Sequence, residues 1–120
     1  GHVTIEDYAI LGGLVPVHQF VNIGKHSYIG GGFRVSKDVP PFILASSEPL
    51  TYSGLNIVGL RRRGFTAENR ALIKRAYRLL FRSEYNTTQA LEQVKNQLPQ
   101  TEEIQYIVDF VESSERGIIG

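Results

Sequence analysis

Aliphatic residues recur at every sixth position through the first third of the chain. An amphipathic helix repeats near 3.6 residues and a simple strand every 2, so a sustained period of six fits neither. The period is typical of hexapeptide repeats, in which short strands wind around a triangular prism and three hexads make a coil of about 18 residues. It predicts a left-handed parallel β-helix with one aliphatic residue buried on each face. The residues of the series are Ile5, Leu11, Val17, Ile23, Ile29 and Val35, with a second series at Val3, Ala9, Val15, Val21, Ser27, Phe33 and Val39.

The hexad period ends at Pro40-Pro41, where proline offers no backbone N–H to a further rung. Residues 42–65 show no period, because Pro49, Gly54 and scattered Ser and Thr interrupt it. We therefore expect three parts: the last coils of the β-helix over residues 1–41, an irregular or extended excursion over 42–65, and a small α-helical domain over 66–120.

Helical spacing of apolar residues returns after residue 65 and predicts three helices. The first lies near 67–83 with Thr66 as its N-cap, the second has Thr87 or Thr88 as its N-cap and ends at Pro99, and the third has Thr101 as its N-cap. The residues expected to face inward are Leu72, Ile73, Ala76, Tyr77 and Leu80 in the first helix, Ala90, Leu91, Val94 and Leu98 in the second, and Ile104, Ile107, Val108 and Val111 in the third.

The amino-acid composition limits the size of the domain and excludes several kinds of site. The 120 residues, 42% of them hydrophobic, fit one modest domain or a piece of a larger one. The absence of cysteine excludes disulfides, cysteine–zinc sites and thiol nucleophiles. No apolar run is long enough for a membrane span, and no signal peptide opens the sequence. Because fewer than about three coils fit before Pro40, we expect the chain to be the C-terminal part of a longer protein.

Charge is distributed unevenly although the net charge is only +1. Residues 1–60 sum to about −1, 61–82 to about +7 and 83–120 to about −5. Like charges four residues apart repel on a helix, so the regular basic series on the first predicted helix indicates an anionic partner. Pairing with acidic residues of the last helix is the alternative, and nucleic acid fits poorly because no aromatic residues are interleaved. The basic residues are Arg70, Lys74, Arg78 and Arg82, and the acidic ones Glu102, Glu103, Asp109 and Glu112.

The histidines His2, His18 and His26 raise the question of a metal site. Zinc requires three or four converging ligands. The 24 residues between His2 and His26 place them on different faces of the predicted coil, so we expect no metal site within one chain. An assembly between chains, as in γ-class carbonic anhydrases, is the alternative.

Several short motifs together resemble the bacterial UDP-N-acetylglucosamine 3-O-acyltransferases, the first enzymes of lipid A synthesis. The resemblance covers the whole chain as roughly the last half of such an enzyme. Its motifs are Gly1-His2-Val3, Val17-His18-Gln19-Phe20, Asp38-Val39-Pro40-Pro41, Asn56-Ile57, the run from Gly59 to Phe65, and Ser114-Glu115-Arg116-Gly117-Ile118-Ile119.

This resemblance implies a cytoplasmic homotrimer of a Gram-negative bacterium, with active sites between neighbouring prisms. The reaction is transfer of an (R)-3-hydroxyacyl group from acyl carrier protein to the sugar 3-hydroxyl of UDP-N-acetylglucosamine, without a cofactor. The family's general base, a histidine, falls upstream of Gly1, so we do not expect the 120 residues alone to turn over.

The resemblance also implies roles for individual residues. The Gly1 backbone N–H would stabilise the oxyanion, while His2, His18 and Gln19 would contact the sugar nucleotide or the acyl-phosphopantetheine. Asn56, Arg62 and Arg63 would hold the UDP, since arginine's planar fork suits phosphate. Where the family often has an acidic residue, this chain has Val58. Gly31 would leave room for a long hydroxyacyl chain, and Arg70, Lys74, Arg78 and Arg82 would dock the acidic carrier protein.

Other interpretations remain open. Surface histidines on turns, glycines that only allow a tight turn, and a solvated basic turn would each explain the same residues. A related hexapeptide acyltransferase could act on an amino-sugar nucleotide, and a fragment without the base could be a non-catalytic module for trimerisation or carrier-protein binding.

Overall fold

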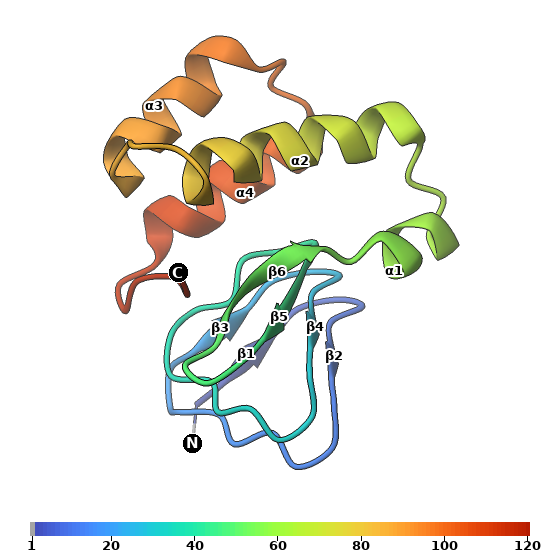
Figure 1. Ribbon diagram of the computed structural model, residues 1–120, viewed down its shortest axis with the longest axis vertical. Coiled ribbons are helices and arrows are strands. Elements are labelled where there is room, and N and C mark those ends of the chain that lie inside the picture. The colour runs from blue at the N-terminus through green and yellow to red at the C-terminus, as the bar shows by residue number, and fades with distance from the viewer. Residues whose placement is uncertain (1) are drawn as a thin grey trace.

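The computed structural model describes residues 2–120, which form a stack of short strands with helices packed against one end (Figure 1). The strands are β1 (Thr4–Ile5), β2 (Ile10–Leu11), β3 (Asn22–Ile23), β4 (Tyr28–Ile29), β5 (Ile43–Ser46) and β6 (Thr51–Leu55). The helices are α1 (Ile57–Arg62), α2 (Ala67–Phe81), α3 (Thr87–Gln97) and α4 (Glu102–Ser113).

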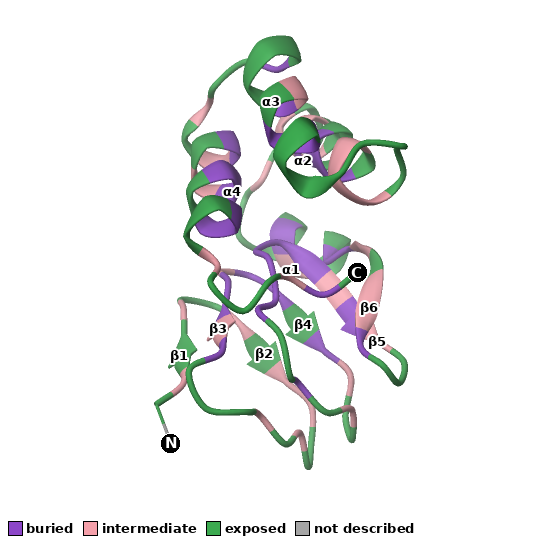
Figure 2. Ribbon diagram, turned by 90° about the vertical axis from the view of Figure 1, so that its left-hand side faces the viewer, coloured by how far each residue is buried: buried purple, intermediate pink, exposed green. Residues whose placement is uncertain are grey.

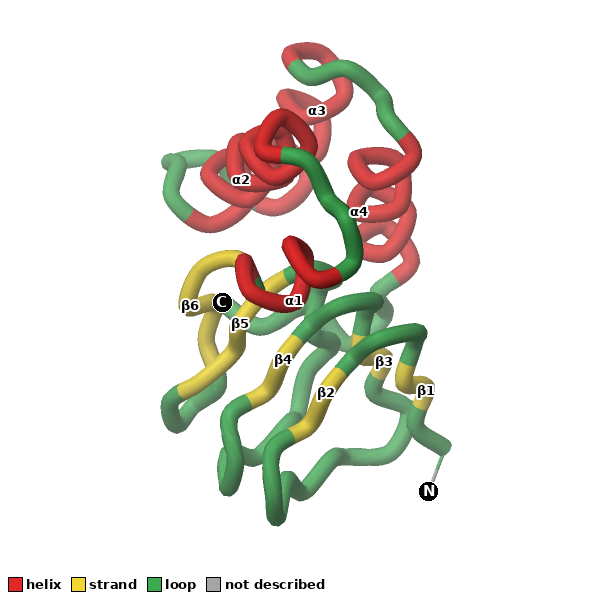
Figure 3. The backbone as a smooth tube through the Cα atoms, turned by 90° about the vertical axis from the view of Figure 1, so that its right-hand side faces the viewer, coloured by secondary structure: helices red, strands yellow, loops and turns green. Residues whose placement is uncertain are grey.

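The first four strands pair in parallel with a partner 18 positions along the chain. Thr4 of β1 pairs with Asn22 of β3, and Ile10 of β2 pairs with Tyr28 of β4. The next step is shorter, because Tyr28 pairs with Leu44 of β5. Figure 3 shows β2, β4 and β5 following one another along one face. The chain therefore returns to the same face at the interval predicted from three hexads.

Left-handed backbone conformations recur every six residues and mark the turns between strands. Tyr8, Leu14, Phe20 and His26 have φ angles of 61°, 55°, 64° and 58°, and Gly32 continues the series at 82°. Residues other than glycine seldom adopt this conformation. Because the coil length is three such steps, turn residues 18 apart come to lie over one another.

Burial of the aliphatic series depends on the position of the rung. Ile23, Ile29 and Val35 are completely buried, whereas Ile5 keeps 51% of its surface exposed. In Figure 2 the strand β1, which contains Ile5, has the colour of exposed residues. Ile5 lies in β1, which pairs only with β3 among the described residues. The first described rung is therefore less well covered than the rungs that follow it.

The segment over residues 42–65, expected to be an irregular or extended excursion, contains two strands and a short helix. β5 and β6 form an antiparallel hairpin in which Ile43 pairs with Leu55, and α1 follows directly. β5 also pairs with β4, so the hairpin extends the sheet of the coils. The hairpin is stabilised by this contact with β4, which no local sequence pattern reveals.

The three predicted helices after residue 65 are present as α2, α3 and α4. The predicted N-caps Thr66 and Thr101 are confirmed, since each side chain accepts a hydrogen bond from a first-turn N–H. The cap of α3 is Asn86 rather than Thr87 or Thr88. Asn86 and Gln89 form a reciprocal capping box, which satisfies two backbone donors at once.

Buried hydrogen bonds help to join the helices and the C-terminal residues to the strand stack. The Tyr77 hydroxyl of α2, fully buried, donates to the Pro41 carbonyl at 2.5 Å, and burial raises the pKa of Tyr77 well above its usual value. The buried Asp38 carboxylate accepts hydrogen bonds from the Asn22 N–H at 2.8 Å and from the Ser114 hydroxyl at 2.5 Å. The Asp-Val-Pro-Pro motif is thus the joint between the two parts.

Gly12 and Gly13 provide a matched test of coil packing. A Cβ at Gly12 would lie 2.5 Å from the Gly31 backbone nitrogen, whereas a Cβ at Gly13 meets nothing within 4 Å. We expect Gly12→Ala to reduce the free energy of unfolding by about 1–3 kcal/mol, since the neighbouring rung must move. Gly13→Ala should change it by less than about 0.5 kcal/mol. Urea denaturation measures both variants, and equal losses would contradict close contact between the rungs.

Candidate functional site

The predicted site residues fall into separate groups. His2, His18 and Gln19 lie at exposed turns of the coils, Asn56, Arg62 and Arg63 lie at the two ends of α1, and the basic residues lie on α2. None of the cavities described below is lined by members of more than one group. Gly1 lies outside the described residues.

The turn that carries His18 and Gln19 packs next to His2. The His2 ring stacks on Phe20 with their centroids 5.5 Å apart, and the Phe20 N–H donates to the His2 carbonyl. The Gln19 carbonyl accepts a hydrogen bond from Arg116 Nη1 at 3.1 Å, so the chain near its C-terminus holds this turn. Both imidazoles remain exposed and accessible to a ligand.

Gly31 lies against the previous coil. A Cβ there would come within 3.2 Å of the Gly13 carbonyl oxygen. Close backbone approach therefore accounts for the glycine structurally, and its role in selecting acyl length stays a prediction.

Asn56 is buried, and its side chain forms hydrogen bonds within the chain. Its Oδ1 accepts from the Gly59 N–H at the start of α1, and its Nδ2 donates to the His26 carbonyl at 2.9 Å. Asn56 also borders an apolar cavity of about 370 Å³, which Arg62 borders from the other end of α1. The remaining lining residues are Ile10, Tyr28, Leu44, Leu55, Ile57, Val58 and Gly59.

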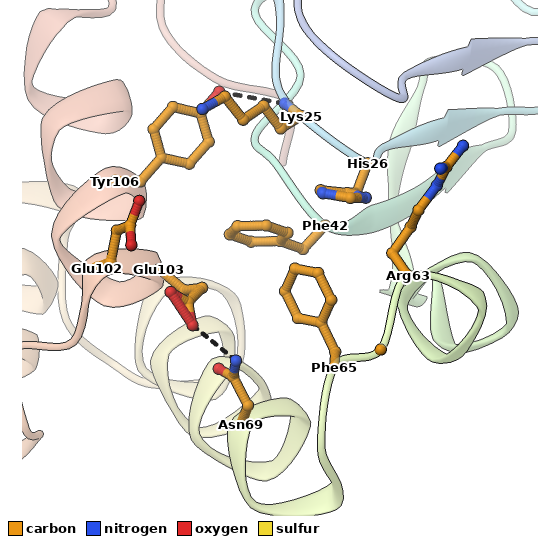
Figure 4. Close-up of a pocket in the computed structure, with 10 residues that line it drawn as sticks. Lys25, His26, Phe42, Arg63, Phe65, Asn69, Glu102, Glu103 and Tyr106 are labelled. Carbon is orange, nitrogen blue, oxygen red and sulfur yellow. Dashed lines mark hydrogen bonds between the residues drawn. The ribbon is translucent and has the colours of Figure 1, made fainter.

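Arg63, although adjacent to Arg62, faces a different cavity, of about 360 Å³, between the coils and helices α2 and α4 (Figure 4). The Arg63 guanidinium lies 3.9 Å from the centroid of the Tyr8 ring. Acidic residues border the opposite side, where Glu103 accepts a hydrogen bond from Asn69 Nδ2 at 2.6 Å. Lys25 also borders the cavity, beside Tyr106 of α4, so the lining carries both cationic and anionic side chains.

An aromatic cluster that the sequence analysis missed supports this cavity. The His26 ring stacks on Tyr8 at 4.9 Å and on Phe42 at 5.8 Å, and the edge of Phe65 meets it at 5.0 Å. A signal was available, because Tyr8 and His26 are one coil of 18 residues apart and occupy equivalent turns. Burial lowers the pKa of His26, and the charges of Arg63 and Lys25 lower it further, against a smaller opposite effect of Asp7.

The four basic residues predicted to dock the carrier protein do not all lie at one place on α2. Lys74, Arg78 and Arg82 line a groove of about 270 Å³ beside β6, with Tyr52, Ser53 and Gly54 on its other side. Arg70 is not part of this groove, and its Nη1 donates to the Phe65 carbonyl at 2.7 Å.

The alternative explanation for the basic series, pairing with acidic residues of α4, receives no support from the geometry. The ion pair to Glu112 comes from Lys95 of α3, at 3.3 Å. Over residues 2–120 no basic side chain of α2 forms an ion pair with an acidic one. The groove is left with uncompensated positive charge.

Among residues 2–120 no cluster of three or more His, Cys, Asp or Glu side chains is arranged to hold a metal ion. Within the same residues no helix has the length and apolar character needed to cross a membrane.

Comparison with known proteins gives one consistent result. Residues 38–119 match the family model described as UDP N-acetylglucosamine O-acyltransferase, domain 2. The chain is 46% identical over 119 residues to the acyl-[acyl-carrier-protein]–UDP-N-acetylglucosamine O-acyltransferase of Aliivibrio salmonicida, covering 99% of this chain and 45% of that protein.

Solved structures agree. A UDP-N-acetylglucosamine acyltransferase from Bacteroides fragilis superposes with a TM-score of 0.96 at 50% identity, over 98% of this chain and 46% of that one. The protein from Acinetobacter baumannii gives a TM-score of 0.94 at 40% identity, over 100% and 47%. The chain spans about half the length of the relatives it matches.

The position of His26 makes a prediction about pH. Because its pKa is lowered in the folded chain, the unfolded chain binds more protons as the pH falls below the ordinary value of 6.5. The stability that depends on neutral His26 is therefore present above that pH and is lost on acidification. We expect His26→Phe to lose less stability than the unmodified chain between about pH 7.5 and pH 5, as measured by urea denaturation. Parallel losses would contradict the prediction.

Proposed function

The chain belongs to the UDP-N-acetylglucosamine O-acyltransferase family, and from this we propose that it supplies the substrate-binding part of such an enzyme. The proposed reaction moves an (R)-3-hydroxyacyl group from acyl carrier protein to the 3-hydroxyl of UDP-N-acetylglucosamine. The observation that carries the proposal is the family match over residues 38–119. The enzyme would act in the cytoplasm as a homotrimer.

We also propose that the strand stack is the end of a left-handed parallel β-helix. Three observations support this: the 18-residue parallel registers, the left-handed residues at every sixth position, and the TM-scores near 0.95 with solved relatives. The division at residues 41 and 66 stays part of the proposal. The separation of the histidine group from the arginine group fits a site assembled between neighbouring subunits, because no single chain needs to bring them together.

The proposed roles of the site residues follow from their exposure and chemistry. A neutral imidazole both donates and accepts hydrogen bonds, so exposed His2 and His18, with Gln19 beside them, suit hydroxyl and carbonyl groups of the substrates. Arg62 and Arg63 offer in-plane N–H pairs to the diphosphate. The Gly1 N–H would face the oxyanion, and the proton of the sugar hydroxyl would go to a histidine that precedes position 1 in the family pattern.

A fusion protein tests the proposed reaction. We expect this chain, joined to the N-terminal portion of the Bacteroides fragilis relative, to acylate UDP-N-acetylglucosamine, because the added segment supplies the base. The 120-residue chain alone should show no transfer. Arg62→Ala in the fusion should raise KM for the sugar nucleotide about tenfold or more, since a hydrogen bond to a charged group is worth about 1.5–3 kcal/mol.

The sugar nucleotide that the fusion protein acylates distinguishes the proposed reaction from its alternatives. A fusion that uses only a 3-amino sugar nucleotide would favour the N-acyltransferase alternative. A trimeric fusion that is inert with both acceptors would overturn the proposed reaction.

The groove on α2 makes a separate prediction about the acyl donor. Its unpaired positive charge would attract an acidic carrier protein and speed docking. We expect Lys74→Glu to lower kcat/KM for the carrier-linked donor about tenfold at low salt, with less effect at high salt. Arg75→Glu, an equal charge change on the same helix outside this groove, is the control. Equal losses in the two variants would contradict a localised docking site.

A further inference from the structure

Tyr8 contacts the Arg63 guanidinium from a different part of the chain. Tyr8 lies at a turn of the first described coil, and Arg63 is the residue at which α1 ends. The guanidinium carbon is 3.9 Å from the centroid of the Tyr8 ring, well within the range of a cation–π contact. No side-chain hydrogen bond or ion pair of Arg63 is found within residues 2–120. The Tyr8 ring is therefore the group that orients this guanidinium.

The contact with Tyr8 leaves the Arg63 guanidinium able to bind an anion. A guanidinium is planar and carries its five N–H donors in that plane. Arg63 makes no side-chain hydrogen bond or ion pair within residues 2–120, so its contact with Tyr8 leaves these donors available, whereas an ion pair with a carboxylate would occupy two. Arg63 is thus held in place while its whole hydrogen-bonding edge stays free.

The Tyr8 ring packs on the aromatic cluster that contains His26, Phe42 and Phe65. His26 stacks on Tyr8 at 4.9 Å, and Phe42 and Phe65 pack on His26 in turn. The His26 ring is 8% exposed, and its main chain is tied to the same turn because its N–H donates to the Asp7 carbonyl at 3.0 Å. Its lowered pKa keeps the imidazole neutral near pH 7, so it does not repel the nearby guanidinium. The Tyr8 ring is therefore supported by a packed aromatic cluster.

We propose that Tyr8 is a positioning residue that holds the Arg63 guanidinium on its ring, so that the free N–H edge meets the diphosphate of the nucleotide sugar. The inference rests on the proposed function, in which Arg63 contacts that diphosphate. Tyr8 itself need not touch the substrate. Because Tyr8 acts only through Arg63, a substitution of Tyr8 should have no effect once Arg63 has been removed.

The test is a double-mutant cycle in the intact protein, with UDP as the probe and isothermal titration calorimetry as the measurement. Tyr8→Leu removes the ring and should weaken UDP binding about three- to fivefold, as expected for an exposed cation–π contact. Tyr8→Phe keeps the ring and should bind UDP as the unmodified protein does. In the Arg63→Ala background, Tyr8→Leu should produce no further loss. Steady-state kinetics should show the same dependence in KM for the sugar nucleotide, with kcat unchanged.

The outcomes separate this inference from the function on which it rests. If Arg63→Ala weakens UDP binding but Tyr8→Leu does not, positioning by Tyr8 is wrong and the role of Arg63 stands. If Tyr8→Leu weakens binding equally with and without Arg63, the tyrosine acts on the fold and the inference is overturned. If Arg63→Ala leaves UDP binding unchanged, both the proposed role of Arg63 and the inference fail. Thermal unfolding of each variant shows whether a loss of binding reflects a loss of fold.

Discussion

Parallel backbone pairing between residues 18 positions apart is the constraint on which the rest of the structure depends. It fixes which side chains share a level, because residues one coil apart must lie over one another. Aliphatic residues at equivalent positions therefore form the interior, and aromatic residues at equivalent turns form stacks on the exterior. The stacks of His2 on Phe20 and of Tyr8 on His26 both follow from this single spacing. The left-handed turn residues are what make so short a strand repeat possible.

The motif residues 38–41 illustrate how a family signature can be structural rather than chemical. Asp38 is buried and its carboxylate is satisfied by hydrogen bonds from the preceding coil and from Ser114. Pro41 presents its carbonyl to the Tyr77 hydroxyl. Asn56 behaves similarly, since it caps α1 and binds the His26 carbonyl. The residues that we propose to contact the substrates are instead exposed, namely the two histidines and the arginines at the end of α1.

Much of this arrangement could be predicted from the sequence, and the exceptions have identifiable causes. The hexad period and the apolar spacing after Thr66 are local patterns, so the short strands and the helices α2, α3 and α4 could be predicted from the sequence. The hairpin of β5 and β6 depends on contact with β4, and the step from Tyr28 to Leu44 departs from 18 residues, so periodicity could not place Phe42 under His26. Which of two adjacent arginines meets Tyr8 depends on where α1 ends, and a pattern of residue types does not fix that.

The contacts of residues 114–116 impose an order on folding. Ser114 reaches Asp38 across 76 positions, and Arg116 reaches the Gln19 carbonyl across 97. Contacts so distant along the chain form late and slow folding, because a large loop must close before they stabilise anything. During synthesis the coils therefore lack these contacts until residues 114–116 have left the ribosome. Until then the Asp38 carboxylate and the Gln19 carbonyl lack these partners, so this side of the coils reaches its native packing only in a late stage of folding.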